Sequence, residues 1–258
     1  MYPITRLPSI LLACYLALAA LWQPALAQQT PDATEIVRRA DQKMRGESSR
    51  SEITMRIVRP SWERELSLKG WSLGSEFSLI LVTAPARDAG TAYLKRGNEI
   101  WHWLPDINRT VKLPPSMMSQ SWMGSDFSNN DLVRESSIVS DYEHSLAGDS
   151  TVSGRECWRI EMTPKPDAPV VWGTVVSYIS KQEYLQLRTE FYDEEGLLVK
   201  TMEGSDIASM DGRTIPTRMV MIPADEAGHR TELLYHSLAF DVGLEASFFS
   251  TQNMKRVE

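Results

Sequence analysis

The chain has 258 residues, of which 42% are hydrophobic and 24% are charged, and its formal net charge at pH 7 is −7. An acidic chain without a basic stripe is a poor partner for nucleic acid and gains little from an anionic lipid surface. We therefore predict neither nucleic-acid binding nor electrostatic attachment to a membrane.

The first 27 residues have the pattern of a secretory signal peptide. Arg6 precedes an apolar run over 10–22, and the segment ends in Ala-Leu-Ala at 25–27, which is a small-residue cleavage signature. We predict cleavage near Ala27, export from the cytoplasm and a single mature domain over 28–258.

The two cysteines cannot form a disulfide in the mature chain, because Cys14 lies within the predicted signal peptide. An alternative is a lipoprotein, since residues 11–14 loosely resemble a lipidation box, but apolar sequence continues past Cys14. Cys157 lies in a strand-like stretch and is expected to be a buried structural thiol rather than a reactive one.

Residues 31–46, PDATEIVRRADQKMRG, predict one amphipathic helix. Its apolar residues recur at the spacing of a single helical face, Asp32 or Thr34 can cap the first turn, and Gly46 suits the left-handed position that ends a helix. The apolar face of this helix must cover another element.

The rest of the chain has the alternating pattern of β-strands with short connections. Strands are expected over 51–58, 62–71, 75–83, 91–105 (two strands around a turn at 96–98) and 110–114, then over 136–148, 151–165, 170–181, 185–204, 204–223 and 229–243. Hairpin turns are expected at 193–196 and at Asp211-Gly212. Residues 244–256 are expected to form a short helix or turn that places Phe248 and Phe249 against the body.

The segment 114–133, PPSMMSQSWMGSDFSNNDLV, interrupts this pattern with two predicted short helices. Ser116 can cap the first, which runs to Trp122 before Gly124, and Ser128 or Asn129 can cap the second. Methionine adapts to ligands of varying shape, so the segment is a candidate lid. Composition alone favours the alternative, a plug for the sheet. Trp122→Ala should leave the thermal midpoint nearly unchanged in a lid and lower it in a plug.

This order of elements predicts a mainly β, α+β fold. Short connections imply antiparallel pairing, and a sheet of about a dozen strands curls. The concave face of a curled sheet is filled by side chains, helices or a ligand.

The run GNEIWHWLPDINRTVKLP, followed by SWMGSDFSNNDLV, resembles the periplasmic outer membrane lipoprotein-sorting proteins of the LolA/LolB-like superfamily. The resemblance is carried by the aromatic strand 101–105, a basic residue at Arg109 or Lys112, and the motif 123–132. The motif keeps Gly124, Asp126, Phe127, Ser128, Asp131 and Leu132. It departs from the family at Ser125, where threonine is common, and at Asn129-Asn130, where an aromatic-acidic pair is common.

The resemblance implies a large curled antiparallel sheet, forming a half-open barrel covered by an N-terminal helix and short inserted helices. It implies one lipid- or lipoprotein-binding domain over 28–258 with an apolar cavity for acyl chains, located in the periplasm. It also implies a carrier that shuttles a lipid or lipoprotein towards the outer membrane, together with an RND-type inner-membrane transporter. We expect no cofactor, no metal and a monomer.

The expected ligand-binding residues are apolar side chains of the predicted strands and of the inserted segment. They are Ile53, Met55, Leu66, Leu68, Phe77, Leu79, Leu81, Trp101, Trp103, Met117, Met118, Trp122 and Phe127. Arg109 and Lys112 are expected either to contact a headgroup or to be solvated strand charges. A register error of one residue would move a whole set of strand residues to the other face.

The sequence contains no nucleophile elbow, no phosphate-binding glycine loop and no dinucleotide fingerprint. The four histidines and Cys157 do not have metal-ligand spacing. We therefore predict a binding protein rather than an enzyme. A lipid-sensing regulatory module is the alternative to a carrier, and a hydrolase on a β scaffold is the third hypothesis.

Overall fold

The computed structural model describes residues 32–133, 138–166, 168 and 170–257. Residues 32–258 form one compact unit, and the predicted signal peptide lies outside the described residues. In the described part of the chain, every helix is too short or too polar to cross a bilayer.

Helix α2 (Ala33–Arg45) is the predicted N-terminal helix. The Asp32 side chain accepts a hydrogen bond from the Thr34 backbone N–H at 3.1 Å, and Gly46, with φ of 67°, follows the last turn. Glu35 lies in the first turn, and Lys43 and Arg45 lie in the last, where each sign of charge suits the helix dipole. Both predicted ends of the helix are confirmed.

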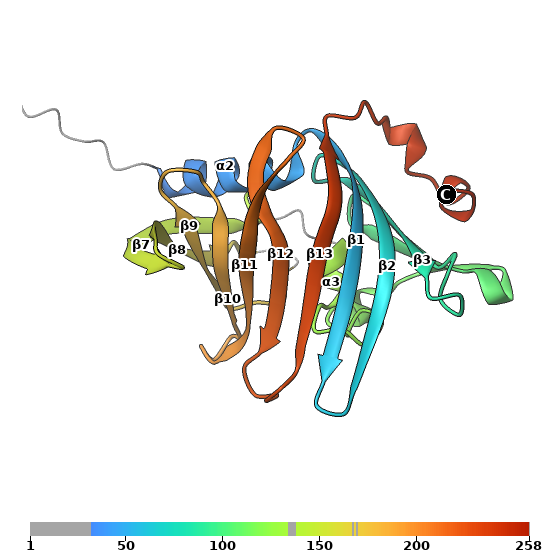
Figure 1. The fold of residues 1–258 in the computed structure, drawn as a ribbon, viewed down its shortest axis with the longest axis horizontal. Coiled ribbons are helices and arrows are strands. Elements are labelled where there is room, and N and C mark those ends of the chain that lie inside the picture. Colours follow the sequence, from blue (N-terminus) through green and yellow to red (C-terminus); the bar gives the residue numbers. More distant parts are fainter. Residues whose placement is uncertain (1–31, 134–137, 167, 169, 258) are drawn as a thin grey trace, which may run out of the picture. The chain divides into compact units, whose positions relative to one another are not determined.

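The described strands form a single antiparallel sheet of thirteen, which confirms the predicted fold class. They are β1 (Ser48–Arg59), β2 (Trp62–Leu73), β3 (Phe77–Ala84), β4 (Ala92–Arg96), β5 (Glu99–Leu104), β6 (Arg109–Lys112), β7 (Tyr142–Val152), β8 (Arg155–Pro164), β9 (Thr174–Ser180), β10 (Gln186–Tyr192), β11 (Leu198–Met210), β12 (Arg213–Pro223) and β13 (Arg230–Phe240). Their order is β6-β5-β4-β3-β2-β1-β13-β12-β11-β10-β9-β8-β7, and the sheet curls as Figure 1 shows.

The two edges of the sheet are consecutive in the sequence. Strand β6 is one edge and β7 is the other, while β13 pairs with β1 and joins the two halves. The chain between β6 and β7 must therefore pass from one edge to the other. We call residues 113–133 the crossing segment. It contains η2 (Pro115–Met117) and α3 (Asn129–Val133), and Figure 1 shows α3 behind β13 and β1.

The first predicted helix of the crossing segment is only one 3-10 turn, over Pro115–Met117. A tight loop replaces the rest of it. The Trp122 N–H donates to the Phe127 carbonyl at 2.7 Å, and Met123 and Gly124 both have positive φ, at 51° and 81°. Residues 118–122 form a turn, a bend and an isolated bridge between Ser121 and Ser128 rather than helix, so this part of the prediction is wrong.

The second predicted helix is confirmed as α3, and Ser128 caps it. The Ser128 hydroxyl accepts from the Asp131 N–H at 3.1 Å, and the Asp131 carboxylate accepts from the Ser128 N–H at 2.7 Å. This reciprocal pair has the geometry of a capping box.

The predicted hairpin turns are confirmed at Gly97, Gly196 and Asp211-Gly212, all of which have positive φ. The strand predicted from residue 136 is wrong at its start. It begins at Tyr142, residues 138–141 form a turn, and 136–137 lie outside the described residues.

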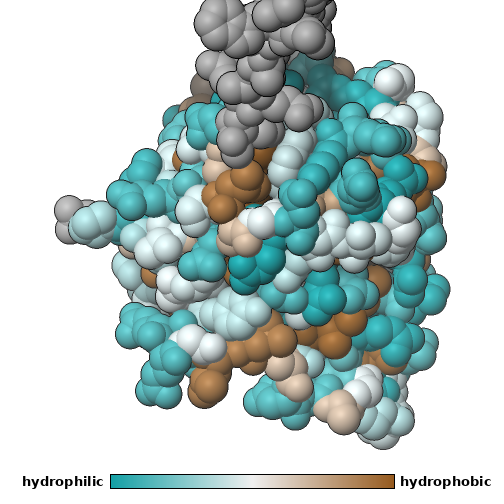
Figure 2. All heavy atoms as spheres, turned by 90° about the vertical axis from the view of Figure 1, so that its left-hand side faces the viewer, coloured by the Kyte–Doolittle hydropathy of each residue, from teal (hydrophilic) through white to brown (hydrophobic). Residues whose placement is uncertain are grey.

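Two groups of side chains cover the concave face of the sheet. Helix α2 packs its buried face, including Ile36 and Val37, against β7, β8 and β9. The crossing segment packs Met118, Trp122 and Phe127 against β1 to β5, β12 and β13. The outer surface at the β7 edge is mainly hydrophilic, with a few hydrophobic patches (Figure 2).

The C-terminal segment covers the opposite face of β2 to β5. It contains η3 (Ala246–Phe248) and η4 (Asn253–Lys255), and Phe249 and Met254 are buried against these strands. The predicted placement of Phe249 against the body is confirmed.

We predict that Trp122→Ala lowers the free energy of unfolding by about 3–5 kcal/mol. Trp122 is 0% exposed, and its ring lies 5.2 Å from that of Tyr93, so truncation leaves a cavity in a packed core. Urea denaturation measures the change. Trp62→Ala is the matched control, because Trp62 is 48% exposed, and it should cost less than about 1 kcal/mol. Equal, small effects of the two substitutions would show that the crossing segment is a loosely packed lid.

Candidate functional site

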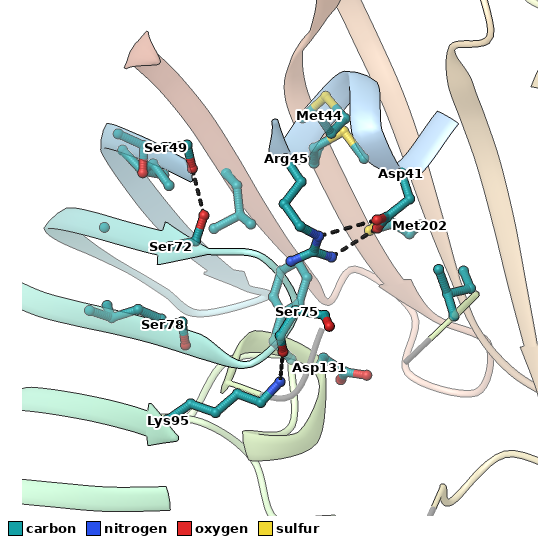
Figure 3. Close-up of a pocket in the computed structure, with 18 of the residues that line it drawn as sticks. Asp41, Met44, Arg45, Ser49, Ser72, Ser75, Ser78, Lys95, Asp131 and Met202 are labelled. Atoms are coloured by element: carbon teal, nitrogen blue, oxygen red, sulfur yellow. Dashed lines mark hydrogen bonds and ion pairs between the residues drawn. The ribbon is translucent and has the colours of Figure 1, made fainter. Parts of the chain in front are cut away.

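A cavity of about 280 Å³ lies on the concave face of the sheet, where α2 and the crossing segment leave the sheet uncovered (Figure 3). This volume is just below the roughly 300–1,000 Å³ typical of ligand pockets. Apolar residues from α2, both halves of the sheet and the crossing segment contribute to its lining. They include Met44, Ile53, Leu68, Ile80, Phe127, Ile138, Phe191, Met202, Met219, Met221, Leu233 and Leu238.

The strand register makes one end of the cavity polar. Ser49, Ser72 and Ser78 lie side by side on β1, β2 and β3, and Lys95 continues the same row on β4. The hydroxyl oxygens of Ser49 and Ser72 are 2.7 Å apart. The Lys95 ammonium donates to the Ser75 carbonyl at 2.5 Å.

The adjacent rows become steadily more apolar. Ser51, Gly70 and Ile80 form the next row across β1, β2 and β3, and Ile53, Leu68 and Val82 form the row after it. Because side chains two residues apart on a strand share a face, these rows form one continuous wall. The wall changes from hydroxyl-lined to aliphatic over about two pleats of the sheet.

Helix α2 contributes an ion pair at the rim of the cavity. Arg45 contacts both carboxylate oxygens of Asp41, at 2.9 and 3.2 Å, and both side chains are mostly buried. Burial raises the pKa of Tyr142, which also lines the cavity, and the nearby Asp141 and Asp131 raise it further. Its hydroxyl therefore stays neutral at physiological pH.

A buried ion pair fastens the crossing segment to the sheet. Both oxygens of the Asp126 carboxylate lie 3.0 Å from the Arg59 guanidinium, which also donates to the Gly124 carbonyl at 3.0 Å. The Thr231 hydroxyl donates to Asp126 at 2.6 Å. Asp126 is thereby tied to both β1 and β13, the two strands that join the halves of the sheet.

A second buried ion pair ties α3 to the other half of the sheet. The Lys200 ammonium on β11 contacts the Asp131 carboxylate, and both side chains are less than a tenth exposed. The same ammonium lies 4.8 Å from the ring centroid of Trp172 and 5.4 Å from that of Phe191, where cation–π attraction adds to the pairing. Asp126 and Asp131, two residues of the motif 123–132, are thus anchors of the crossing segment.

Some of the expected ligand-binding residues come together at the cavity. Ile53, Leu68 and Phe127 line it from the concave face, and Phe77 and Leu79 border it although their side chains alternate to the opposite face. Phe77 and Leu79 also pack beneath the C-terminal segment, and the Phe77 ring lies 5.5 Å from that of Phe249.

The other expected residues lie in packed clusters outside the cavity lining. Met55 and Leu66 are buried under the crossing segment, whose own Met118 and Trp122 are buried with them and whose Met117 packs against the same cluster. Leu81 and Trp103 are buried on the opposite face with Trp101 packed beside them. Arg109 is exposed, and Lys112 is exposed and paired with Glu99.

Sequence reasoning missed the polar row and the half of the wall formed by β10, β11 and β12. Ser49 and Ser51 are spaced two residues apart on the same strand as Ile53, and therefore share its face. This spacing could have indicated that the apolar face of the strand continues into a polar end. The contribution of Phe191, Met202 and Met219 depends on long-range pairing, and no local signal indicates it.

Among the described residues, Asp126, Glu226 and His229 form one group of potential metal ligands, with ligand atoms within 4.8 Å of one another. Asp126 is already bound by Arg59 and Thr231. The adjacent guanidinium opposes a cation there, and we assign no metal to this group.

A family model described as an uncharacterized protein matches residues 74–256. No curated protein matches the sequence. A domain from Vibrio parahaemolyticus assigned to outer membrane lipoprotein sorting has a TM-score of 0.77 and 24% identity, and the match covers 87% of this chain and 98% of that one.

Two further solved structures are similar over nearly their whole length. A DUF1329 family protein from Desulfovibrio piger has a TM-score of 0.77 and 28% identity, with 86% of this chain and 97% of that one covered. A LolA superfamily protein from Nitrosomonas europaea has a TM-score of 0.75 and 23% identity, with 86% and 99% covered. The open, thirteen-stranded sheet is therefore a LolA-like fold.

We predict that Arg59→Met lowers the free energy of unfolding by about 3–5 kcal/mol, because it leaves the Asp126 carboxylate buried without its cation. Hydrogen exchange of the amides over 121–131 should accelerate, since the loop loses its anchor. Adding Asp126→Asn to Arg59→Met should recover part of the stability by removing the buried charge.

Arg56→Met is the matched control for this prediction. Arg56 is on the same strand, and its ion pair with Glu65 is largely exposed, so the substitution should cost less than about 1 kcal/mol. If the two arginine variants are equally stable, the Arg59–Asp126 pair does not anchor the crossing segment.

Proposed function

We propose that the chain, which belongs to the family whose model matches residues 74–256 and has a LolA-like fold, is a carrier that holds an acyl chain of a lipid or lipoprotein. The observation that supports this most directly is the cavity on the concave face, whose interior wall is aliphatic and aromatic. An acyl chain needs such a wall, because each methylene removed from water contributes about 0.8 kcal/mol.

A carrier must release its cargo as well as bind it. Ordering the chain in the cavity offsets part of the gain from burial, and a cavity of about 280 Å³ encloses only a limited length of hydrocarbon. Met44, Met202, Met219 and Met221 contribute flexible, unbranched side chains to the wall, which suits acyl chains of differing length and unsaturation.

The proposed location is the periplasm, after cleavage of a signal peptide near Ala27. Supporting this are the charged, apolar and small-residue regions of the first 27 residues. We further propose that the chain acts as a monomer and that an RND-type inner-membrane transporter loads or unloads it. The transporter part of the proposal rests on the family resemblance alone.

We propose a binding function rather than catalysis. Among the described residues that line the cavity there is no histidine and no cysteine, and both lining carboxylates, Asp41 and Asp131, are engaged in ion pairs. Histidine and unpaired carboxylates are the commonest general acids and bases in enzymes.

We predict that the purified wild-type protein binds a fluorescent fatty acid and that Met202→Trp weakens this binding by about tenfold or more, a change of at least about 1.4 kcal/mol. Met202 lines the cavity from β11, and an indole there occupies the space of the ligand. Fluorescence titration measures the affinity.

Leu198→Trp is the matched control, because Leu198 is on the same strand, exposed and outside the cavity lining. It should leave the affinity unchanged. The proposal fails if wild-type protein takes up no fatty acid and native mass spectrometry finds no co-purified lipid. Transfer of the bound lipid between vesicles would distinguish a carrier from a sensor, which binds without transfer.

A further inference from the structure

We infer that the ligand of the cavity has an uncharged head that carries hydroxyl groups, and that this head lies against Ser78 of β3 and Asn130 of α3. A monoacylglycerol has this chemistry. The inference rests on the proposed function, because it assumes that the aliphatic wall receives an acyl tail. It adds the chemical class of the head and the place where the head binds.

The carboxylates that line the cavity are already paired within the protein. Asp41 contacts Arg45, Asp131 contacts Lys200, and the side chains of both pairs are mostly buried. A cationic head loses hydration when it enters a cavity, and it needs an anionic partner in exchange. It would meet no unpaired carboxylate among the described lining residues.

The cations that line the cavity are engaged as well. Lys95 donates to the Ser75 carbonyl at 2.5 Å, and both Lys95 and Arg45 have further interactions within the protein. Lys69 borders the cavity but is opposite Leu81 in the strand register, and Leu81 belongs to the cluster on the other face of the sheet. An anionic head would therefore lose its hydration without gaining an unengaged cation from these residues.

Two uncharged side chains at the cavity have unused hydrogen-bonding capacity. In the part of the chain that the structure describes, the Ser78 hydroxyl and the Asn130 side-chain oxygen are buried and have no hydrogen-bond partner. Buried polar atoms nearly always have one. Since both residues line the cavity, a ligand in the cavity is the partner that we expect for them.

The two unpartnered atoms specify what the head must provide. An amide oxygen only accepts hydrogen bonds, whereas a serine hydroxyl both donates and accepts them. The head therefore needs a donor for Asn130 and an oxygen atom for Ser78. Hydroxyl groups supply both without a charge, and an ester carbonyl beside them supplies a further acceptor.

The fold brings the two side chains to the same part of the cavity. Asn130 is on α3, α3 packs against β4, and β4 is the neighbour of β3, which carries Ser78. The Asn130 backbone N–H donates to the Met118 carbonyl at 2.9 Å, so the position of Asn130 is fixed by the crossing segment. The head is thus placed between β3 and α3.

The row of serines sets the direction in which the ligand lies. Ser78 continues the row of Ser49 and Ser72 on the neighbouring strands (Figure 3), and Ile53 and Leu68 lie two rows further along the wall. A head at Ser78 therefore directs the tail towards the aliphatic rows, where its burial is favourable.

The test uses ligands that share one tail and differ in the head: monododecanoylglycerol, dodecyl glucoside, methyl dodecanoate, dodecanoate and dodecyltrimethylammonium. Isothermal titration calorimetry with the wild-type protein measures each affinity, at a pH at which dodecanoate is ionised. Each neutral hydrogen bond corresponds to about twofold to tenfold in affinity. We expect monododecanoylglycerol, dodecyl glucoside or both to bind about tenfold more tightly than the methyl ester and than either charged ligand. The preferred one of the two identifies the source as an acylglycerol or a glycolipid.

Two variants locate the head. Ser78→Ala and Asn130→Leu should each weaken binding of the preferred hydroxyl-bearing ligand by about twofold to tenfold. The side-chain oxygen that each substitution removes has no partner within the protein, so the thermal midpoint without ligand should stay unchanged or rise. A side chain with a purely structural role would instead lower the midpoint when replaced.

Ser205→Ala is the matched control. The Ser205 hydroxyl is also buried and without a partner among the described residues, but Ser205 is on β11 and outside the cavity lining. Its substitution should leave the affinities for all of the ligands unchanged.

The outcomes separate this inference from the proposed function. If methyl dodecanoate or dodecanoate binds as tightly as the hydroxyl-bearing ligands, the uncharged, hydroxyl-bearing head is wrong while the acyl carrier stands. If Ser78→Ala and Asn130→Leu bind as Ser205→Ala does, the head does not lie between β3 and α3. If none of the ligands binds, the proposed function itself fails.

Discussion

The need to connect the two edges of one open sheet governs this structure. Strands β6 and β7 are consecutive in the chain but form the opposite edges of a thirteen-stranded sheet, so the segment between them must traverse a face of the sheet. A segment buried there must satisfy its backbone polar groups and fill the space beneath it. The crossing segment does both, through the bonded loop at 121–128 and through Trp122 and Phe127.

The motif 123–132 is best understood as the means by which this segment is held in place. Gly124 and Met123 make the left-handed turn, Asp126 binds Arg59, and Asp131 both caps α3 and binds Lys200. Buried ion pairs contribute little net stability when compared with well-packed apolar residues, but breaking one partner is costly. Their effect here is to fix the position of the segment relative to both halves of the sheet.

The cavity is present because helix α2 and the crossing segment pack on different parts of the concave face of the sheet. Helix α2 covers β7 to β9, and the crossing segment covers β1 to β5 with parts of β12 and β13, and the cavity lies on the wall between these two covers. The uncovered wall changes from serines to aliphatic side chains along the strands. Such a gradient complements an amphiphile, because head and tail have opposite requirements for solvation.

The sequence by itself determined the elements whose causes are local. The caps of α2 and α3, the positive-φ hairpin turns and the antiparallel character of the sheet all follow from residues within a few positions of one another. The resemblance of 97–114 and 121–133 to a known superfamily also placed the fold correctly. Only the tertiary structure decided which face each strand residue occupies. Phe77, Leu79 and Leu81 share one face as their spacing predicts, but Phe249, distant in sequence, covers that face. Pairing of β13 with β1 brings Met219 and Leu233 to the wall shared with Ile53 and Leu68. Such contacts depend on packing between distant segments, and no local pattern of residues encodes them.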